Sequence, residues 1–82
     1  MRLDKFLKVS RIFKRRTIAK EVAKNGRVII NGRTAKPGTE LKPDDILEIS
    51  YGQKTITVKV LKLASHIKKE DADSMYQILD ES

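Results

Sequence analysis

Residues 2–32 of this 82-residue chain combine a high positive charge with two helical patterns, a short strand and a turn. Residues 1–36 contain 12 lysines and arginines against 2 acidic residues, whereas residues 37–82 contain 6 against 9. A helical segment that gathers cations in this way presents a charged face, and polyphosphates are the commonest partners of such faces. The charge distribution therefore predicts a nucleic-acid-binding module.

An amphipathic helix is expected at the start of this segment. With about 100° of rotation per residue, Leu3, Phe6 and Leu7 share one apolar stripe. A different arc carries basic side chains, those of Lys5, Lys8, Arg11 and Arg15. Continuing the helix would bring Lys14 into the apolar stripe, so the regular helix is expected to end near residues 9–10.

A second helix is expected over residues 18–24. Thr17 is a suitable N-cap, because its side-chain oxygen can accept a hydrogen bond from the first turn. Asn25 and Gly26 would close this helix, with Gly26 in the left-handed conformation that follows many helices. The basic segment thus predicts two helices in succession.

An antiparallel sheet is expected after the helices. Residues 27–30 are rich in β-branched side chains, and the Asn31-Gly32 pair that follows is the strongest two-residue hairpin signal. Alternating patterns bounded by turns predict three further strands, over residues 33–36, 46–51 and 55–63. Two helices followed by a sheet of about four strands define an α+β fold.

The last 19 residues follow a different pattern. A mixed charge run over residues 68–71 precedes four apolar residues at helical spacing: Ala72, Met75, Tyr76 and Leu79. Two alternatives stay open for this segment, a short amphipathic C-terminal helix and a frayed or disordered end. The expected organisation is therefore one domain over residues 1–63 and a tail over residues 64–82.

Length and composition limit the classes of function. A chain of 82 residues is one small domain with an expected stability of about 4–12 kcal/mol, which leaves little core for an enzymatic cleft. The chain has no cysteine and no apolar run close to about 18 residues, so disulfides, thiolate metal sites and membrane spans are not expected. His66 stands alone without partners in sequence. We expect a cytoplasmic protein without metal or cofactor.

Several motifs in residues 2–60 resemble those of the S4 RNA-binding domain family. They follow the family's order and spacing: Arg2-Leu3-Asp4, Arg16-Thr17-Ile18-Ala19, Gly26-Arg27-Val28, residues 28–32 and Lys36-Pro37. The resemblance implies the αL arrangement, in which two helices pack on a small bent antiparallel sheet. One departure is Asp44, where S4 domains usually have glycine; aspartate tolerates the left-handed conformation.

Within this family the chain is most similar to the small ribosome-associated quality-control factors of the RqcP type. The resemblance implies binding to large ribosomal subunits that carry stalled peptidyl-tRNA, with contacts to both rRNA and tRNA. It also implies support for alanine tailing of the nascent chain by a partner that delivers tRNA. The alternatives are a heat-shock-type S4 protein that recycles such subunits and a general binder of structured RNA. A monomer is expected off the ribosome.

The resemblance also implies which residues bind RNA. Arg2 and Arg16 would be the main contacts, because guanidinium groups bind phosphate bidentately and backbone N–H groups at helix starts also favour anions. Further phosphate contacts would come from the other basic residues of the segment: Lys5, Lys8, Arg11, Lys14 and Arg15.

For the other residues of the segment, a structural role is the alternative to a contact with RNA. Asp4 is expected to stabilise the start of the first helix or to orient Arg16 through an ion pair. Asn31 is expected to form the turn first and to touch RNA only secondarily, while Phe6 and Phe13 are expected in the core. A catalytic role is disfavoured because the chain shows no arrangement of nucleophile and base. Binding to a membrane surface is disfavoured because the apolar stripe is short and must cover the sheet.

Overall fold

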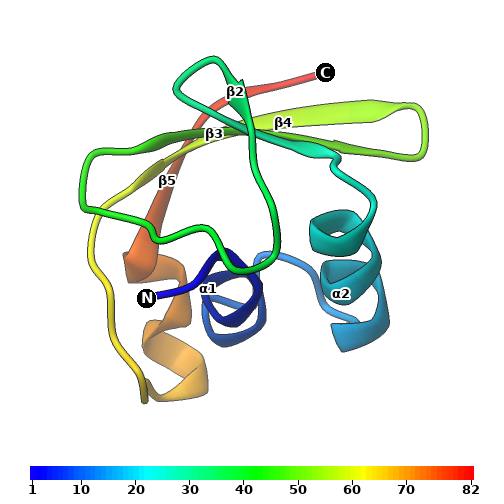
Figure 1. Ribbon diagram of the computed structural model, residues 1–82. Coiled ribbons are helices and arrows are strands. Elements are labelled where there is room, and N and C mark those ends of the chain that lie inside the picture. Colours follow the sequence, from blue (N-terminus) through cyan, green and yellow to red (C-terminus); the bar gives the residue numbers. More distant parts are fainter.

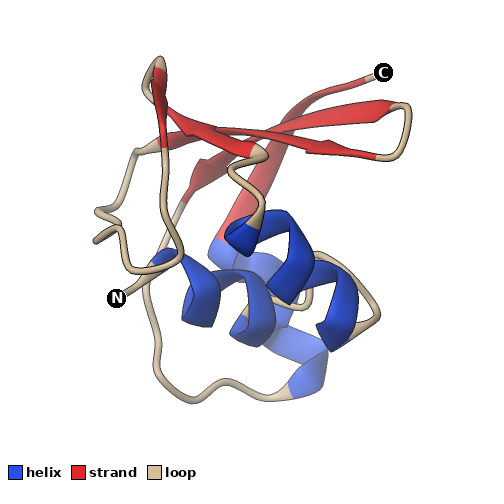
Figure 2. Cartoon of the chain, turned by 45° about the vertical axis from the view of Figure 1, so that its right-hand side comes forward, coloured by secondary structure: helices blue, strands red, loops and turns tan.

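A layer of helices covers one side of an antiparallel sheet (Figures 1 and 2). The computed structural model describes the backbone of residues 1–82 and every side chain except that of residue 16. The helices are α1 (Leu3–Val9), α2 (Arg16–Lys24) and the 3-10 helix η1 (Lys69–Met75). The strands are β1 (Val28–Ile30), β2 (Arg33–Thr34), β3 (Ile46–Tyr51), β4 (Lys54–Val60) and β5 (Tyr76–Glu81). The sheet order is β2-β1-β3-β4-β5, and the expected α+β S4 arrangement is confirmed.

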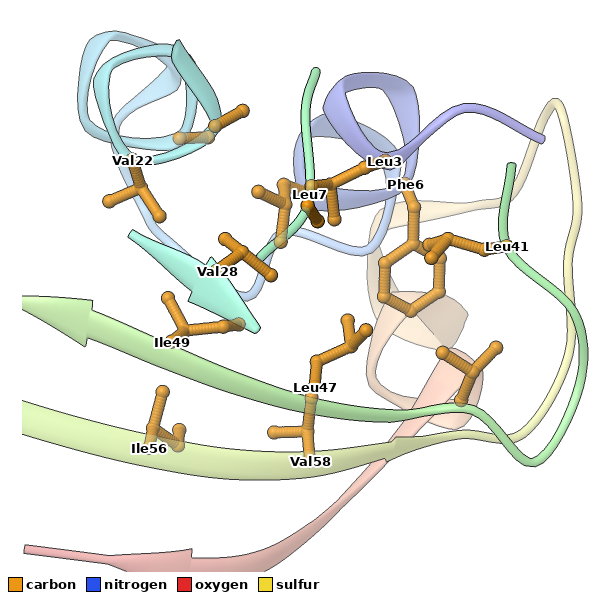
Figure 3. Packing of buried hydrophobic residues seen from close by; sticks show 14 of the residues in the cluster. Leu3, Phe6, Leu7, Val22, Val28, Leu41, Leu47, Ile49, Ile56 and Val58 are labelled. Carbon is orange, nitrogen blue, oxygen red and sulfur yellow. The ribbon is translucent and has the colours of Figure 1, made fainter. Parts of the chain in front are cut away.

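Helix α1 places its apolar stripe on the sheet. Leu3, Phe6 and Leu7 are fully buried, and Figure 3 shows Phe6 pointing toward Leu41 and Leu47. The helix ends at Val9, as predicted. Because this apolar stripe is buried in the core, the basic arc of the same helix faces outward.

Helix α2 begins earlier than the sequence indicated. The predicted N-cap, Thr17, lies inside the helix, and Arg15 occupies the cap position with extended φ and ψ angles of −106° and 127°. No side-chain hydrogen bond caps this end among the described residues, so the prediction from Thr17 was wrong. Ala19, Val22 and Ala23 are buried against the rest of the core.

The hairpin and the central strands agree closely with expectation. Asn31 and Gly32 both have positive φ, 50° and 86°, which is the combination a tight primed turn requires between β1 and β2. Asp44 also has a positive φ of 75°, so aspartate does adopt the left-handed conformation at the position where glycine is usual. Strand β4 ends at Val60 rather than continuing to residue 63.

The tail returns to the sheet. A short helix is present as η1, but Tyr76 and Leu79 belong to strand β5, so the helical spacing was wrong for these two residues and the sheet has five strands. Met75 is fully buried, and its carbonyl accepts hydrogen bonds from the backbone N–H groups of Leu61 (2.8 Å) and Lys62 (3.3 Å). These contacts bring β5 beside β4, where it covers an edge that would otherwise be unpaired. The division into a domain over residues 1–63 and a tail over residues 64–82 stays a prediction, although in the fold the tail completes the sheet.

Candidate nucleic-acid interface

A shallow groove of about 420 Å³ runs between α1 and α2. The residues that line it are Asp4, Lys5, Lys8, Ala19 and Lys20. The three lysine side chains are exposed, whereas the small side chain of Ala19 is buried at the bottom of the groove. The packing of the two helices therefore brings cations from separate parts of the sequence to the two sides of one groove, as a nucleic-acid backbone requires.

Arg2 lies at the N-terminal end of α1, where it is the N-cap residue. Its guanidinium Nη2 is 3.2 Å from the Asp4 carboxylate, and 59% of its side chain is exposed. The guanidinium also lies over Gly38, where the Cβ of any other residue would be 3.5 Å from Nη2. Exposed ion pairs contribute little to stability, so Arg2 keeps most of its capacity to bind a phosphate.

The first turn of α1 does not offer the free backbone N–H groups expected there. The N–H groups of Leu3 and Asp4 donate to the carbonyls of Thr39 (2.8 Å) and Pro37 (3.0 Å). The N–H of Lys5 donates to the Asp4 carboxylate at 2.8 Å. The prediction that this helix start favours anions through its backbone was wrong, because a neighbouring loop and the Asp4 side chain already satisfy these donors. Arg2 would bind RNA through its side chain alone.

Asp4 takes the first of its two expected roles. It lies in the first turn of α1, where a carboxylate interacts favourably with the helix dipole, and it pairs with Arg2. The alternative ion pair with Arg16 falls on a side chain outside the described part of the structure. The backbone of Arg16 begins α2, and its role as an RNA contact stays a prediction.

The segment between α1 and α2 carries further exposed cations: Arg11, Lys14 and Arg15. Together with Lys5 and Lys8 they extend the basic surface from the groove to the end of α1. Phe13 from the same segment is half-buried at the margin of the core, where its ring packs edge-to-face on Tyr51 at a centroid distance of 5.0 Å. This packing supports a structural role for Phe13 rather than stacking on a base.

Two parts of the basic surface were missed by the sequence analysis. Lys20 lines the groove from α2, and its spacing of four residues from Arg16 within one helix could have indicated it. His66 and Lys69 come from the tail and line hollows near Arg11. No local pattern places them there, because their position depends on how the tail docks.

Asn31 is engaged in holding the hairpin against β3. Its side-chain oxygen accepts a hydrogen bond from the Ile46 N–H at 3.0 Å, and its Nδ2 donates to the Asp45 carboxylate at 3.1 Å. Its own backbone N–H donates to the Ile46 carbonyl at 3.0 Å. The structure thus supports the turn role of Asn31, and a contact with RNA stays a prediction.

Asn31→Ala is expected to lower the free energy of unfolding by about 2 kcal/mol, because it removes two side-chain hydrogen bonds and places alanine at positive φ. Chemical denaturation followed by circular dichroism measures this change. Asn25→Ala is the matched control, since Asn25 has a φ of −92° and should lose well under about 1 kcal/mol. Equal stability of the two variants would contradict the structural role of Asn31.

The described part of the chain offers neither a metal site nor a membrane span. Among the described residues, no group of three or more His, Asp or Glu side chains is placed to hold a metal ion. The described helices are all too short and too polar to cross a membrane. The basic surface is therefore the candidate binding site, and its charge favours an anionic ligand.

Comparisons with known proteins show the family of the chain. Residues 1–47 match the model of the S4 domain. Two proteins named RQC P-site tRNA stabilizing factor, from Listeria innocua and Bacillus subtilis, are each 58% identical over 99% of this chain, which spans 88% and 94% of their lengths. The trimeric structure of Vibrio cholerae Heat Shock Protein 15 is similar with a TM-score of 0.79 and 26% identity, over 95% of this chain and 80% of that one.

A small S4 domain with a basic helical face is therefore the class that fold and surface define. The chain belongs to the S4 domain family, within the group of the RQC P-site tRNA stabilizing factors.

Proposed function

We propose that this protein is an RNA-binding factor of ribosome-associated quality control. It binds large ribosomal subunits that carry stalled peptidyl-tRNA, contacts rRNA and tRNA, and supports alanine tailing by a partner that delivers tRNA. The observation that carries the proposal is the groove between α1 and α2, which is lined by Lys5, Lys8 and Lys20. Arg2 pairs with Asp4, another residue of the lining. The printed name of the close relatives supports the choice of tRNA as one partner.

The geometry favours folded RNA over single strands. Cations on two helices can contact phosphates on both sides of a groove, and such contacts position a protein without reading bases. Proteins that bind unpaired bases present exposed aromatic rings for stacking. Phe13 and Tyr51 instead pack against each other, and both are only partly exposed. We propose a cytoplasmic binder without catalytic activity of its own.

The proposal is tested by sedimentation with purified large subunits that carry peptidyl-tRNA, compared with vacant large subunits. We expect the protein to pellet with both and to bind the tRNA-carrying subunits more tightly, because rRNA and tRNA would both contribute contacts. Equal binding to vacant subunits, or no binding, would contradict the role of tRNA. Titration with a liposome of anionic lipid is the control for nonspecific attraction to negative charge.

Binding is expected to depend steeply on salt. If about four phosphates are neutralised, the slope of log K against log salt should be roughly −3 to −3.5, a loss of about 100-fold between 50 and 200 mM. The measurement is a binding titration with a labelled protein at four or five salt concentrations. Affinity that is flat over this range would contradict the electrostatic account.

A heat-shock-type recycling role is the second candidate, and the similarity to Vibrio cholerae Heat Shock Protein 15 is the observation that favours it. A reconstituted reaction with stalled subunits distinguishes the two. The tailing role predicts longer alanine tails when the protein is added, whereas the recycling role predicts faster release of tRNA without tails. Light scattering at the same concentrations tests the proposed monomeric state.

A further inference from the structure

A second hollow, of about 190 Å³, lies between the end of α1 and the linker that joins β4 to η1. The residues that line it are Lys8, Val9, Arg11, Ser65, His66 and Ile67. Its volume has room for a phosphate group or several water molecules. The hollow is separate from the α1–α2 groove, but Lys8 lines both, so the two are neighbours on one surface.

The linker wall of this hollow is held in place at several points. Leu63, Ala64 and Ile67 pack against the core, and the backbone just before the linker is bonded to the carbonyl of Met75. Ser65 and His66 therefore project from a segment that is anchored on both sides. Pre-positioned donors of this kind bind a ligand without the entropy cost of ordering a loop.

The chemistry of the hollow favours an anion. Lys8 and Arg11 supply positive charge, Ser65 and His66 supply hydrogen-bond donors, and no acidic side chain is among the described residues that line it. The other hollow that Arg11 lines differs, because Glu70 and Asp73 line it beside Lys14 and Lys69 and offset part of their charge.

The hollow lined by Glu70 and Asp73 also differs in electrostatic potential. Burial, and after it the Asp73 carboxylate, raise the pKa of Tyr76, which lines the hollow that contains Glu70 and Asp73. A carboxylate that disfavours a phenolate there would also disfavour a phosphate. The hollow at Ser65 and His66 is therefore the better suited of the two to negative charge, because cations line it without acids among the described residues.

The backbone of Arg11 gives an independent observation. Its φ is 55°, in the left-handed region just after the Ser10 C-cap of α1, where glycine is the favoured residue. An arginine at this position costs stability relative to glycine. Residues in such conformations cluster at functional sites, and the Arg11 side chain lines the hollow.

We propose that this hollow binds a phosphodiester group of RNA, so that the tail supplies a second RNA contact beside the α1–α2 groove. The proposal rests on the proposed function, because it takes the RNA of the large subunit or its tRNA as the ligand. Lys8 would lie between the two contacts and Arg11 at the far one. The tail would then extend the binding surface as well as complete the sheet.

His66→Glu tests the hollow directly, because it places an acid beside the bound phosphate. We expect binding to tRNA-carrying large subunits to fall by about tenfold, while His66→Lys binds like the wild type. Gln53→Glu, on the exposed turn between β3 and β4, is the matched control for the added charge and should stay within about twofold. Wild-type affinity of His66→Glu would overturn the proposal.

Arg11→Gly separates a binding role from a structural one. Relief of the left-handed conformation should raise the melting temperature by about 4 °C, while loss of one phosphate contact should weaken binding and reduce the salt slope by about 1. A more stable variant with unchanged binding would overturn the proposal. If the wild type itself does not bind the subunits, the proposed function fails instead, so the two failures are distinguishable.

Discussion

Arg2→Ala is expected to weaken binding to tRNA-carrying large subunits by about tenfold or more. A guanidinium that binds phosphate bidentately contributes about 1.5–3 kcal/mol, and each 1.4 kcal/mol is about a factor of ten. The fold should survive, because the Arg2 side chain is 59% exposed and its only ion pair among the described residues is with Asp4. Sedimentation with the subunits measures the affinity, and circular dichroism checks the fold.

The same loss is expected for Arg16→Ala, on the strength of the S4 motif in which Arg16 stands. Lys54→Ala is the matched control, because Lys54 is an exposed cation on β4 and is not among the described residues that line the groove or the hollows. It is a cleaner control than Lys59, which lies 3.6 Å from the Asp44 carboxylate. If both arginine variants sediment like the wild type, the binding face must be sought among Lys8, Arg11, Lys14 and Arg15 instead.

Met75→Ala is expected to lower the free energy of unfolding by about 2–4 kcal/mol and the melting temperature by about 10 °C or more. Met75 is fully buried at the junction of η1 and β5, so its truncation leaves a cavity beneath the strand that closes the sheet. This is a large share of the roughly 4–12 kcal/mol that a chain of this length is expected to have. Thermal unfolding followed by circular dichroism measures both quantities.

Leu79→Ala is the control for this experiment. Leu79 belongs to the same strand but is 48% exposed, so its truncation should lower the free energy of unfolding by less than about 1 kcal/mol. Equal effects of the two substitutions would show that the tail does not depend on the anchor at Met75.

Local patterns predicted the elements that local interactions determine. The apolar stripe of α1 and its end at Val9 follow from helical periodicity alone. The hairpin at Asn31-Gly32 follows from turn chemistry, because this pair adopts positive φ readily. The basic arc was predictable for the same reason, since the side of a helix opposite its buried stripe must face solvent.

Interactions between distant residues account for what the sequence did not predict. Tyr76 and Leu79 have helical spacing, but pairing with β4 decides that they form a strand. The free N–H groups expected at the start of α1 are taken by carbonyls of residues 37 and 39. His66 and Lys69 reach the basic surface through the docking of the tail, which no local window of sequence contains.

The bonds from residues 37–41 to the first turn of α1 have a consequence for folding. Leu3 and Asp4 donate to carbonyls of that loop, and Leu41 donates back to the carbonyl of Met1 at 2.9 Å. Arg2 is therefore held by contacts of long sequence separation, which form late and slowly compared with a helix. A nascent or isolated N-terminal segment would already attract RNA by charge, yet it would lack the fixed position of Arg2. Selective binding to RNA should thus appear only once residues 37–41 have bonded to the first turn of α1. Only the completely folded chain would then bind RNA selectively.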